Sequence, residues 1–261
     1  MKMKKLFVFA GVAMFALSAF TAPEFANFLD MKKAGEAAQK AREFEKMREI
    51  YASWRPKATS TYQKYTCFFG ESRALREMKK FDEAMKVTDD YIASNPPSID
   101  KSSALLVKGV IFTAQNKISE SIPAFESVLK EKEMHGYVKD QTYSNLIYNY
   151  WYTKQFDKCV ELANTVISAG NGPVVEHAYM WASMSLFDGK KFAECEKLSK
   201  AALDVVVKNK SYRAKIAFNY AKCLLERDEE DEPVKYLQEC IKLEPNSWRA
   251  NEAKKLLQEL E

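Results

Sequence analysis

Residues 102–129 read SSALLVKGVIFTAQNKISESIPAFESVL, and this stretch predicts a pair of helices. In its first half Leu105, Gly109 and Phe112 are spaced by four and three residues, so they share one face of a helix. Asn116 and Lys117 interrupt the pattern. In its second half a further set shares a face: Ile118, Ser121, Phe125 and Val128. A single pair of this kind cannot bury its apolar stripes, so the stretch requires neighbours with the same pattern.

The pattern recurs along the chain at intervals of 36–38 residues. The residues expected to open each second helix are Phe44, Phe81, Ile118, Phe156, Phe192 and, more weakly, Glu230. Nine positions earlier lies a column of mostly small residues, where two helices can approach closely: Gly35, Ser72, Gly109, Ile147, Ser183 and Ala221. Three positions later lies another compact column: Met47, Ala84, Ser121, Cys159, Cys195 and Pro233. A fixed period in this range is typical of a solenoid of helical hairpins.

Over residues 28–246 the chain resembles the tetratricopeptide repeat family. The motifs that carry the resemblance are Leu105, Gly109, Phe112, Ser121 and Phe125; Lys80-Phe81-Asp82-Glu83-Ala84 running to Asn95-Pro96; and Ala221, Leu224, Leu237, Cys240 and Leu243-Glu244-Pro245-Asn246. Two features depart from the family pattern: the period exceeds 34 residues, and Ile147 stands where Gly or Ala is usual. The resemblance implies an all-α, right-handed α-solenoid of about six repeats plus a C-terminal capping helix. It also implies that the first helices line a concave surface where extended peptides or partner helices dock.

Breaks in the pattern divide the chain into segments. Helical pairs are expected over residues 28–56, 61–95, 102–132, 140–169, 174–208 and 212–243, and a last helix over 248–260. The expected organisation is a signal peptide at 1–21, the repeat solenoid at 22–246 and the capping helix at 247–261.

The first 21 residues have the pattern of a bacterial secretory signal. Lys2, Lys4 and Lys5 precede an apolar run from Leu6 to Leu17, and small residues follow. Cleavage is expected after Ser18 or Thr21, and the alternative is an uncleaved membrane anchor, for which the run is short. The chain is therefore expected to be exported, to the periplasm or outside the cell, with no membrane span once the signal is removed.

The charge balance argues against a nucleic-acid partner. The whole chain has 40 Lys and Arg against 36 Asp and Glu, and removing the three lysines of the signal leaves 37 against 36. Nucleic-acid-binding domains normally carry a basic excess.

Reactive side chains do not form a recognisable catalytic or metal motif. The five cysteines, at positions 67, 159, 195, 223 and 240, include no Cys-x-x-Cys pair, and His135 and His177 have no partner at metal-ligand spacing. Two interpretations of the cysteines stay open: compact packing residues, or a disulfide such as Cys195–Cys223 in an oxidising compartment. We expect no enzyme activity, no metal and no cofactor.

The first helices of the later repeats have a second apolar face, which predicts a partner-binding surface. The residues predicted to line it are Leu106, Val110, Gln141, Asn145, Tyr148, Trp151, Tyr152, Met180, Met184, Phe187, Phe218 and Lys222. Trp, Tyr, Phe and Met are frequent at binding hot spots, and Tyr148, Trp151, Met184 and Phe187 are expected to be exposed. An alternative interpretation is that these side chains fill contacts between successive first helices. Toward the N-terminus charged residues occupy the same side: Lys32, Glu36, Lys40, Arg73, Arg76 and Glu77.

These features predict a non-enzymatic scaffold or adaptor of the bacterial cell envelope that binds a protein or peptide in a concave aromatic groove. Two alternatives are a self-associating structural solenoid, which would make the chain a homo-oligomer, and a groove that binds a glycan or lipid.

Overall fold

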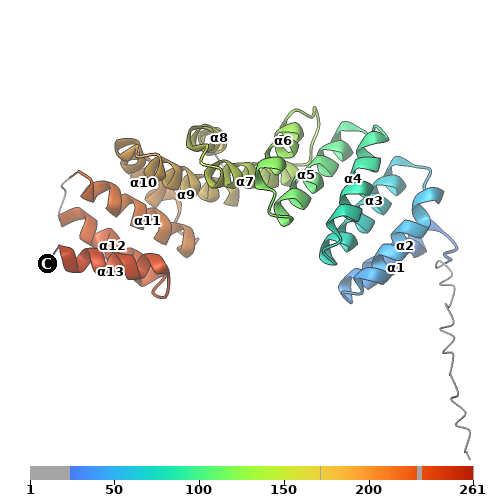
Figure 1. Cartoon of the computed structure of the whole chain (residues 1–261), viewed down its shortest axis with the longest axis horizontal. Helices are drawn as coiled ribbons and strands as arrows, with labels where there is room; N and C mark the ends of the chain where they lie inside the picture. The colour runs from blue at the N-terminus through green and yellow to red at the C-terminus, as the bar shows by residue number, and fades with distance from the viewer. Residues whose placement is uncertain (1–23, 171, 228–230, 261) are drawn as a thin grey trace, which may run out of the picture.

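The computed structural model describes residues 24–170, 172–227 and 231–260, so the expected signal peptide at 1–21 lies outside the described residues. Within these ranges the chain is all-α, with thirteen α-helices, a single 3-10 turn (Arg55–Lys57) and no strand (Figure 1). In chain order the helices are α1 (Phe28–Lys40), α2 (Phe44–Trp54), α3 (Thr61–Glu77), α4 (Phe81–Ala93), α5 (Ser98–Ala114), α6 (Ile118–Leu129), α7 (Gly136–Tyr152), α8 (Phe156–Ala169), α9 (Pro173–Asp188), α10 (Phe192–Val205), α11 (Lys210–Leu225), α12 (Asp231–Leu243) and α13 (Trp248–Glu259). None of these helices combines the length and the apolar character needed to cross a membrane.

The second helix of each of the first five pairs begins at the residue that the repeat pattern predicts, from Phe44 in α2 to Phe192 in α10. Two residues before each of these starts the backbone is left-handed, with φ near 60° at Arg42, Lys79, Asn116, Lys154 and Lys190. The next N–H donates to a carbonyl five residues back, as from Lys117 to Phe112 at 2.9 Å. This is the hydrogen-bond pattern of a Schellman cap. Because the same turn closes five hairpins, the helix starts are evenly spaced along the chain.

Two first helices begin four residues, about one helical turn, earlier than the sequence pattern predicts. The expected starts were Ser102 and Asp140, but α5 begins at Ser98 and α7 at Gly136. Each extra first turn is too short to show an apolar periodicity, so the sequence pattern does not detect it, although Val138 in the added turn of α7 is fully buried.

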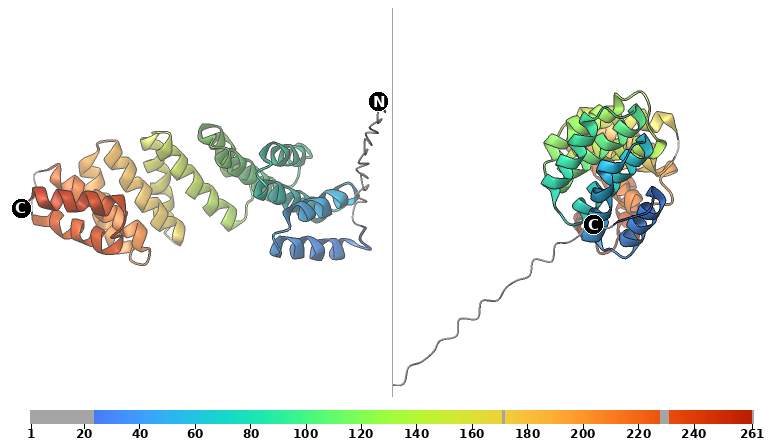
Figure 2. Two further views of the ribbon diagram at one scale, coloured as in Figure 1. Left: turned by 60° about the horizontal axis from the view of Figure 1, so that its bottom comes forward. Right: turned by 90° about the vertical axis from the view of Figure 1, so that its right-hand side faces the viewer.

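The pairs stack into an elongated solenoid (Figures 1 and 2). Each of the helices α1, α3, α5, α7 and α9 contacts the next odd-numbered helix, whereas within the described residues no even-numbered helix contacts the next even-numbered one. The array therefore curves toward the odd-numbered helices, which form its inner layer. Helix α13 packs against α12 and α11 at the C-terminal end.

The predicted small-residue column lies in the core. Gly35, Ser72, Gly109, Ile147, Ser183 and Ala221 are all buried. Gly109 faces the buried ring of Phe125, and a Cβ atom at this position would overlap that ring. Gly35 and Gly70, on α1 and α3, contact the ring of Tyr51 in the same way. Glycine is required at these positions because an aromatic ring of the second helix lies against the backbone of a first helix.

Candidate functional site

Helix α7 positions the aromatic side chains that the sequence singles out. Leu146, Ile147 and Tyr150 are buried in the core of the fourth repeat. The remaining aromatic residues of its last turns are half-buried, or exposed in the case of Tyr152, which keeps 49% of its surface accessible. Since α7 lies beside α9 in the inner layer, these residues occupy the side of the solenoid toward which the array curves.

Three rings of α7 and one of α9 form a continuous group, here named the aromatic cluster: Tyr148, Trp151, Tyr152 and Trp181. The ring centroids of Trp151 and Trp181 are 4.5 Å apart, and those of Tyr148 and Trp181 are 5.1 Å apart in an edge-to-face arrangement. Tyr148 lies 5.9 Å from Tyr152. The structure thus brings together three of the predicted residues and adds Trp181 to them.

Both indole N–H groups of the aromatic cluster are satisfied within the chain. Trp151 Nε1 donates to Asp188 Oδ2 at 2.7 Å, and Trp181 Nε1 donates to His177 Nε2 at 2.8 Å. These bonds fix the orientation of the two rings. What the indoles offer to a ligand is therefore the apolar ring surface, because no N–H group is left free.

His177 is held neutral at this site. Burial, and then the nearby positive charge of Lys215, lowers its pKa to about 4. Because Nε2 accepts the Trp181 hydrogen bond, the proton of the neutral ring resides on Nδ1, which is buried and has no hydrogen-bond partner among the described residues. The sequence places His177 and Trp181 on one face of the same helix, four residues apart, so their contact is local. The burial of the imidazole and its approach to Lys215 are tertiary details.

Toward the C-terminus, positively charged side chains lie next to aromatic rings. The Lys222 Nζ lies 4.6 Å from the ring centroid of Phe187, and the Lys215 Nζ lies 5.7 Å from that of Tyr212. The Arg249 guanidinium lies 4.5 Å from the ring of Trp248. None of these three cations is ion-paired with a carboxylate in the described part of the chain. Burial, followed by the charge of Arg249, lowers the pKa of Lys215.

Three predicted binding residues are core residues instead. Met184 was expected to be exposed, but only 9% of its surface is accessible, and Met180 keeps 1%. Both pack with the buried residues of α11. Phe218, with 3% accessible, packs with α12 and α13. The sequence interpretation was therefore wrong for these three side chains, because the next inner helix covers the face on which they lie.

The other predicted residues are less buried, but they do not form one strip. Leu106 and Val110 are half-buried and pack against the core of the fourth repeat. Gln141 is exposed, and Asn145 donates from its side-chain amide to the Gln141 backbone carbonyl at 2.7 Å. Phe187 is half-buried against Phe192, at a centroid distance of 5.6 Å.

Two of the charged side chains predicted at the N-terminal end, Lys32 and Glu36, interact with each other within the chain. Lys32 Nζ donates to the Tyr62 hydroxyl at 2.7 Å and lies 3.7 Å from a Glu36 carboxylate oxygen. Buried Glu71 lies 3.4 Å from Arg55, and burial raises the pKa of this carboxyl despite the arginine.

The reactive groups do not converge on a metal site. In residues 24–170, 172–227 and 231–260, no cluster of three or more His, Cys, Asp or Glu side chains is arranged to hold a metal ion. All five cysteines are buried free thiols. His135 is exposed and stacks on Tyr137, with the ring centroids 5.6 Å apart.

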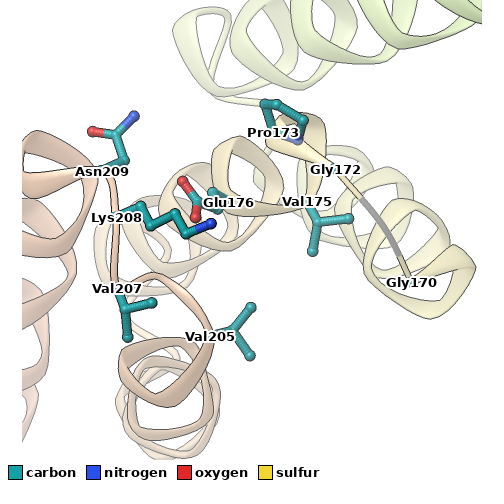
Figure 3. Close-up of a pocket in the computed structure, with 9 residues that line it drawn as sticks. All are labelled: Gly170, Gly172, Pro173, Val175, Glu176, Val205, Val207, Lys208 and Asn209. Carbon is teal, nitrogen blue, oxygen red and sulfur yellow. The ribbon is translucent and has the colours of Figure 1, made fainter.

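A hollow of about 640 Å³ lies away from the aromatic cluster, where the connections α8–α9 and α10–α11 meet (Figure 3). Apolar side chains of Val175, Val205 and Val207 line it together with Glu176 and Lys208. Val205 and Val207 are 45% and 61% exposed. No sequence motif predicts this hollow, although the run Val205-Val206-Val207 at the end of α10 indicates an apolar edge.

Comparison with known proteins gives matches in structure but not in sequence. No protein-family model matches the sequence, and no curated protein matches it. Among solved structures, YrrB, a tetratricopeptide repeat protein with an unusual peptide-binding site, is similar with a TM-score of 0.58 and 14% identity over 72% of this chain and 91% of its own. A tetratricopeptide repeat protein from Parabacteroides merdae ATCC 43184 is similar with a TM-score of 0.57 and 10% identity, over 89% of this chain and 98% of its own. MamA from Desulfovibrio magneticus RS-1 is similar with a TM-score of 0.57 and 13% identity, over 71% and 97%. The chain therefore has the tetratricopeptide repeat fold.

Proposed function

We propose that this chain is a non-enzymatic scaffold that binds an extended peptide segment of a partner protein across the aromatic cluster on its inner face. The observation that carries the proposal is the packing of Tyr148, Trp151, Tyr152 and Trp181 into one group whose indole N–H groups are already paired within the chain. Rigid Tyr and Trp rings supply large contact areas at low entropic cost, and they dominate many binding hot spots.

The unpaired cations beside the aromatic cluster narrow the chemistry of the partner. Lys215 and Lys222 lie on α11, next to the α9 helix that carries Trp181. A peptide that places apolar or aromatic side chains on the aromatic cluster would extend toward these ammonium groups. We therefore expect carboxylates in the partner, flanking its apolar anchor, because opposite charges steer association and set register.

We also propose that residues 1–21 direct export, which would place the scaffold and its partner in the bacterial cell envelope. The supporting pattern is a basic start followed by the apolar run Leu6–Leu17. N-terminal sequencing of the protein recovered from its native host should give a mature chain that begins after Ser18 or Thr21. Recovery of the protein with Met1 intact would contradict the proposal.

The binding proposal is tested with paired substitutions on one helix. Peptides selected by the full chain from a displayed library are labelled, and their affinities are measured by fluorescence anisotropy. The double variant Tyr148→Ala/Tyr152→Ala should raise Kd by about tenfold or more, because it removes two ring surfaces from the aromatic cluster. The control is Tyr137→Ala, which truncates a 54% exposed tyrosine on the same helix outside the cluster and should change Kd less than about twofold.

Equal affinities for the double variant and the wild type, with both folded by circular dichroism, would show that the aromatic cluster is not the binding surface. Sedimentation analysis tests the alternative that the chain associates with a second copy of itself. A mass of two chains that reverts to one chain in the double variant would identify a second copy as the partner. Binding of a glycan or lipid in place of any peptide would also contradict the proposal.

A further inference from the structure

Two buried cysteines from neighbouring repeats meet in the core. Cys195 lies on α10 and Cys223 on α11, and neither has accessible surface. They belong to one small buried cluster with Leu186, and each thiol shifts the pKa of the other, so the two side chains lie close together. The pair therefore places two thiols in the same buried cluster across the junction between the fifth and sixth repeats.

The other three cysteines have different surroundings. The groups that act on the Cys67 thiol are Glu71 and Arg55, and those that act on the Cys240 thiol are Arg249 and Glu244. Cys159 lies 3.3 Å from the Ile147 carbonyl oxygen. A second thiol in the same buried cluster thus distinguishes Cys195 and Cys223 from the remaining cysteines.

The two sulfur atoms of the pair differ in acidity. The hydrogen bond from Cys223 lowers the pKa of the Cys195 thiol against the opposing effect of burial, and Ser199 and Ser183 act in the same direction as Cys223. Donating that bond raises the pKa of Cys223, and burial raises it further. Cys195 is therefore the thiol that ionises more easily, and a thiolate is the nucleophilic form of cysteine.

We propose that Cys195 and Cys223 are an oxidisable pair that forms a disulfide between repeats five and six when the protein meets a hydroperoxide. The Cys195 sulfur attacks one peroxide oxygen, the O–O bond breaks, and Cys195 becomes a sulfenic acid while the other oxygen leaves as water. The Cys223 sulfur then attacks the Cys195 sulfur, the S–O bond breaks, and a second water leaves. In sum, two thiols and one hydrogen peroxide give one disulfide and two waters.

Access to the buried pair comes from local opening of the solenoid. In repeat proteins each repeat contacts only its neighbours, so the C-terminal repeats can open without unfolding the rest. A peroxide needs only a brief exposure of the Cys195 sulfur, and the contact between the two thiols then favours disulfide formation over further oxidation.

The disulfide would connect the end of the inner face to the core beneath it. Phe187 packs against the cysteine cluster, and Lys222, next to Cys223 in sequence, lies over the Phe187 ring. A covalent bond at Cys223 would hold α11 against α10 and so limit movement of this cation relative to Phe187. The inference rests on the thiol contact and not on the proposed peptide binding.

Peptide mapping after mild oxidation tests the proposal. The full chain is treated with hydrogen peroxide under native conditions, denatured, alkylated and digested with trypsin. Cleavage after Lys191 and Lys197 releases FAECEK, and cleavage after Lys222 and Arg227 releases CLLER. We expect these two peptides to be joined by a disulfide and to separate on reduction. The other three cysteines should be recovered in alkylated form. The oxidised chain should melt about 5 °C or more above the reduced chain.

Two variants serve as comparisons. Cys240→Ala removes a buried thiol outside the pair and should still give the joined peptides. Cys223→Ala should give oxidised Cys195 without a cross-link and without the gain in melting temperature. If a variant fails to fold, the peptide map of the wild-type chain still tests the proposal. Alkylation of both Cys195 and Cys223 after peroxide treatment, or disulfides distributed over all five cysteines, would overturn the proposal.

Discussion

Replacing Phe125 with alanine is expected to lower the free energy of unfolding by about 3–5 kcal/mol. The Phe125 ring has no accessible surface and lies against the backbone of Gly109, where no side chain can move in to fill the space. It also belongs to the core cluster that joins α6 to α7 and α8. The substitution therefore removes buried apolar surface and leaves a cavity that the surrounding helices cannot easily close.

Urea denaturation followed by circular dichroism measures this loss. The control is Leu29→Ala on α1, where 56% of the leucine is exposed, and we expect a change within about 0.5 kcal/mol. Gly109→Val should destabilise the wild type because its side chain would overlap the Phe125 ring, but it should cost much less in the Phe125→Ala background. Additive effects of the two substitutions would show that Gly109 and Phe125 are not in contact.

Lowering the pH from 7 to 4 is expected to remove about 3 kcal/mol of stability through His177 alone. In the unfolded chain the imidazole takes up a proton near its ordinary pKa of 6.5, whereas burial and Lys215 hold the folded pKa at about 4. The unfolded state therefore binds more protons between these two values. Stability is fully present above pH 6.5 and declines as the pH falls toward 4.

Protonation would also affect the aromatic cluster. The Trp181 Nε1 donates to His177 Nε2, and a protonated imidazole has no lone pair to accept this bond. Trp181 would then lose the contact that orients its ring against Trp151. We expect the tryptophan fluorescence to change over the same pH range as the loss of stability.

Urea midpoints measured between pH 4 and pH 7 test this prediction. His177→Gln, which has no titratable group, should weaken the pH dependence, while the exposed residue His135 provides the control His135→Gln and should leave it unchanged. An identical pH profile in the wild type and in His177→Gln would rule out His177 as the titrating group.

The sequence alone was sufficient to predict the repeat architecture. The predicted openings at Phe44, Phe81, Ile118, Phe156 and Phe192 coincide with the first residues of α2, α4, α6, α8 and α10. This prediction succeeds because the contacts within a hairpin are local. One turn with a left-handed residue closes each of these five hairpins, so the spacing of apolar and small residues in sequence reproduces their spacing in the structure.

The sequence also identified part of the candidate site. Tyr148, Trp151 and Tyr152 had to lie together because they are neighbours on one helix. Their juxtaposition with Trp181, and the burial of Met180, Met184 and Phe218, depend on the angle at which α7, α9 and α11 pack. Helical periodicity shows that a helix has two apolar faces, but it does not show which of them the next repeat will cover.

Two further features were decided by the tertiary structure alone: the neutral state of His177 and the contact between Cys195 and Cys223. Both arise where helices of different repeats meet, and residues 28 or more positions apart approach each other there only after the repeats stack. The sequence therefore determined the repeating unit, because its contacts are local. The stacking of the units decided which side chains face a partner, which fill the core and which thiols meet, because those contacts depend on the rotation between neighbouring repeats.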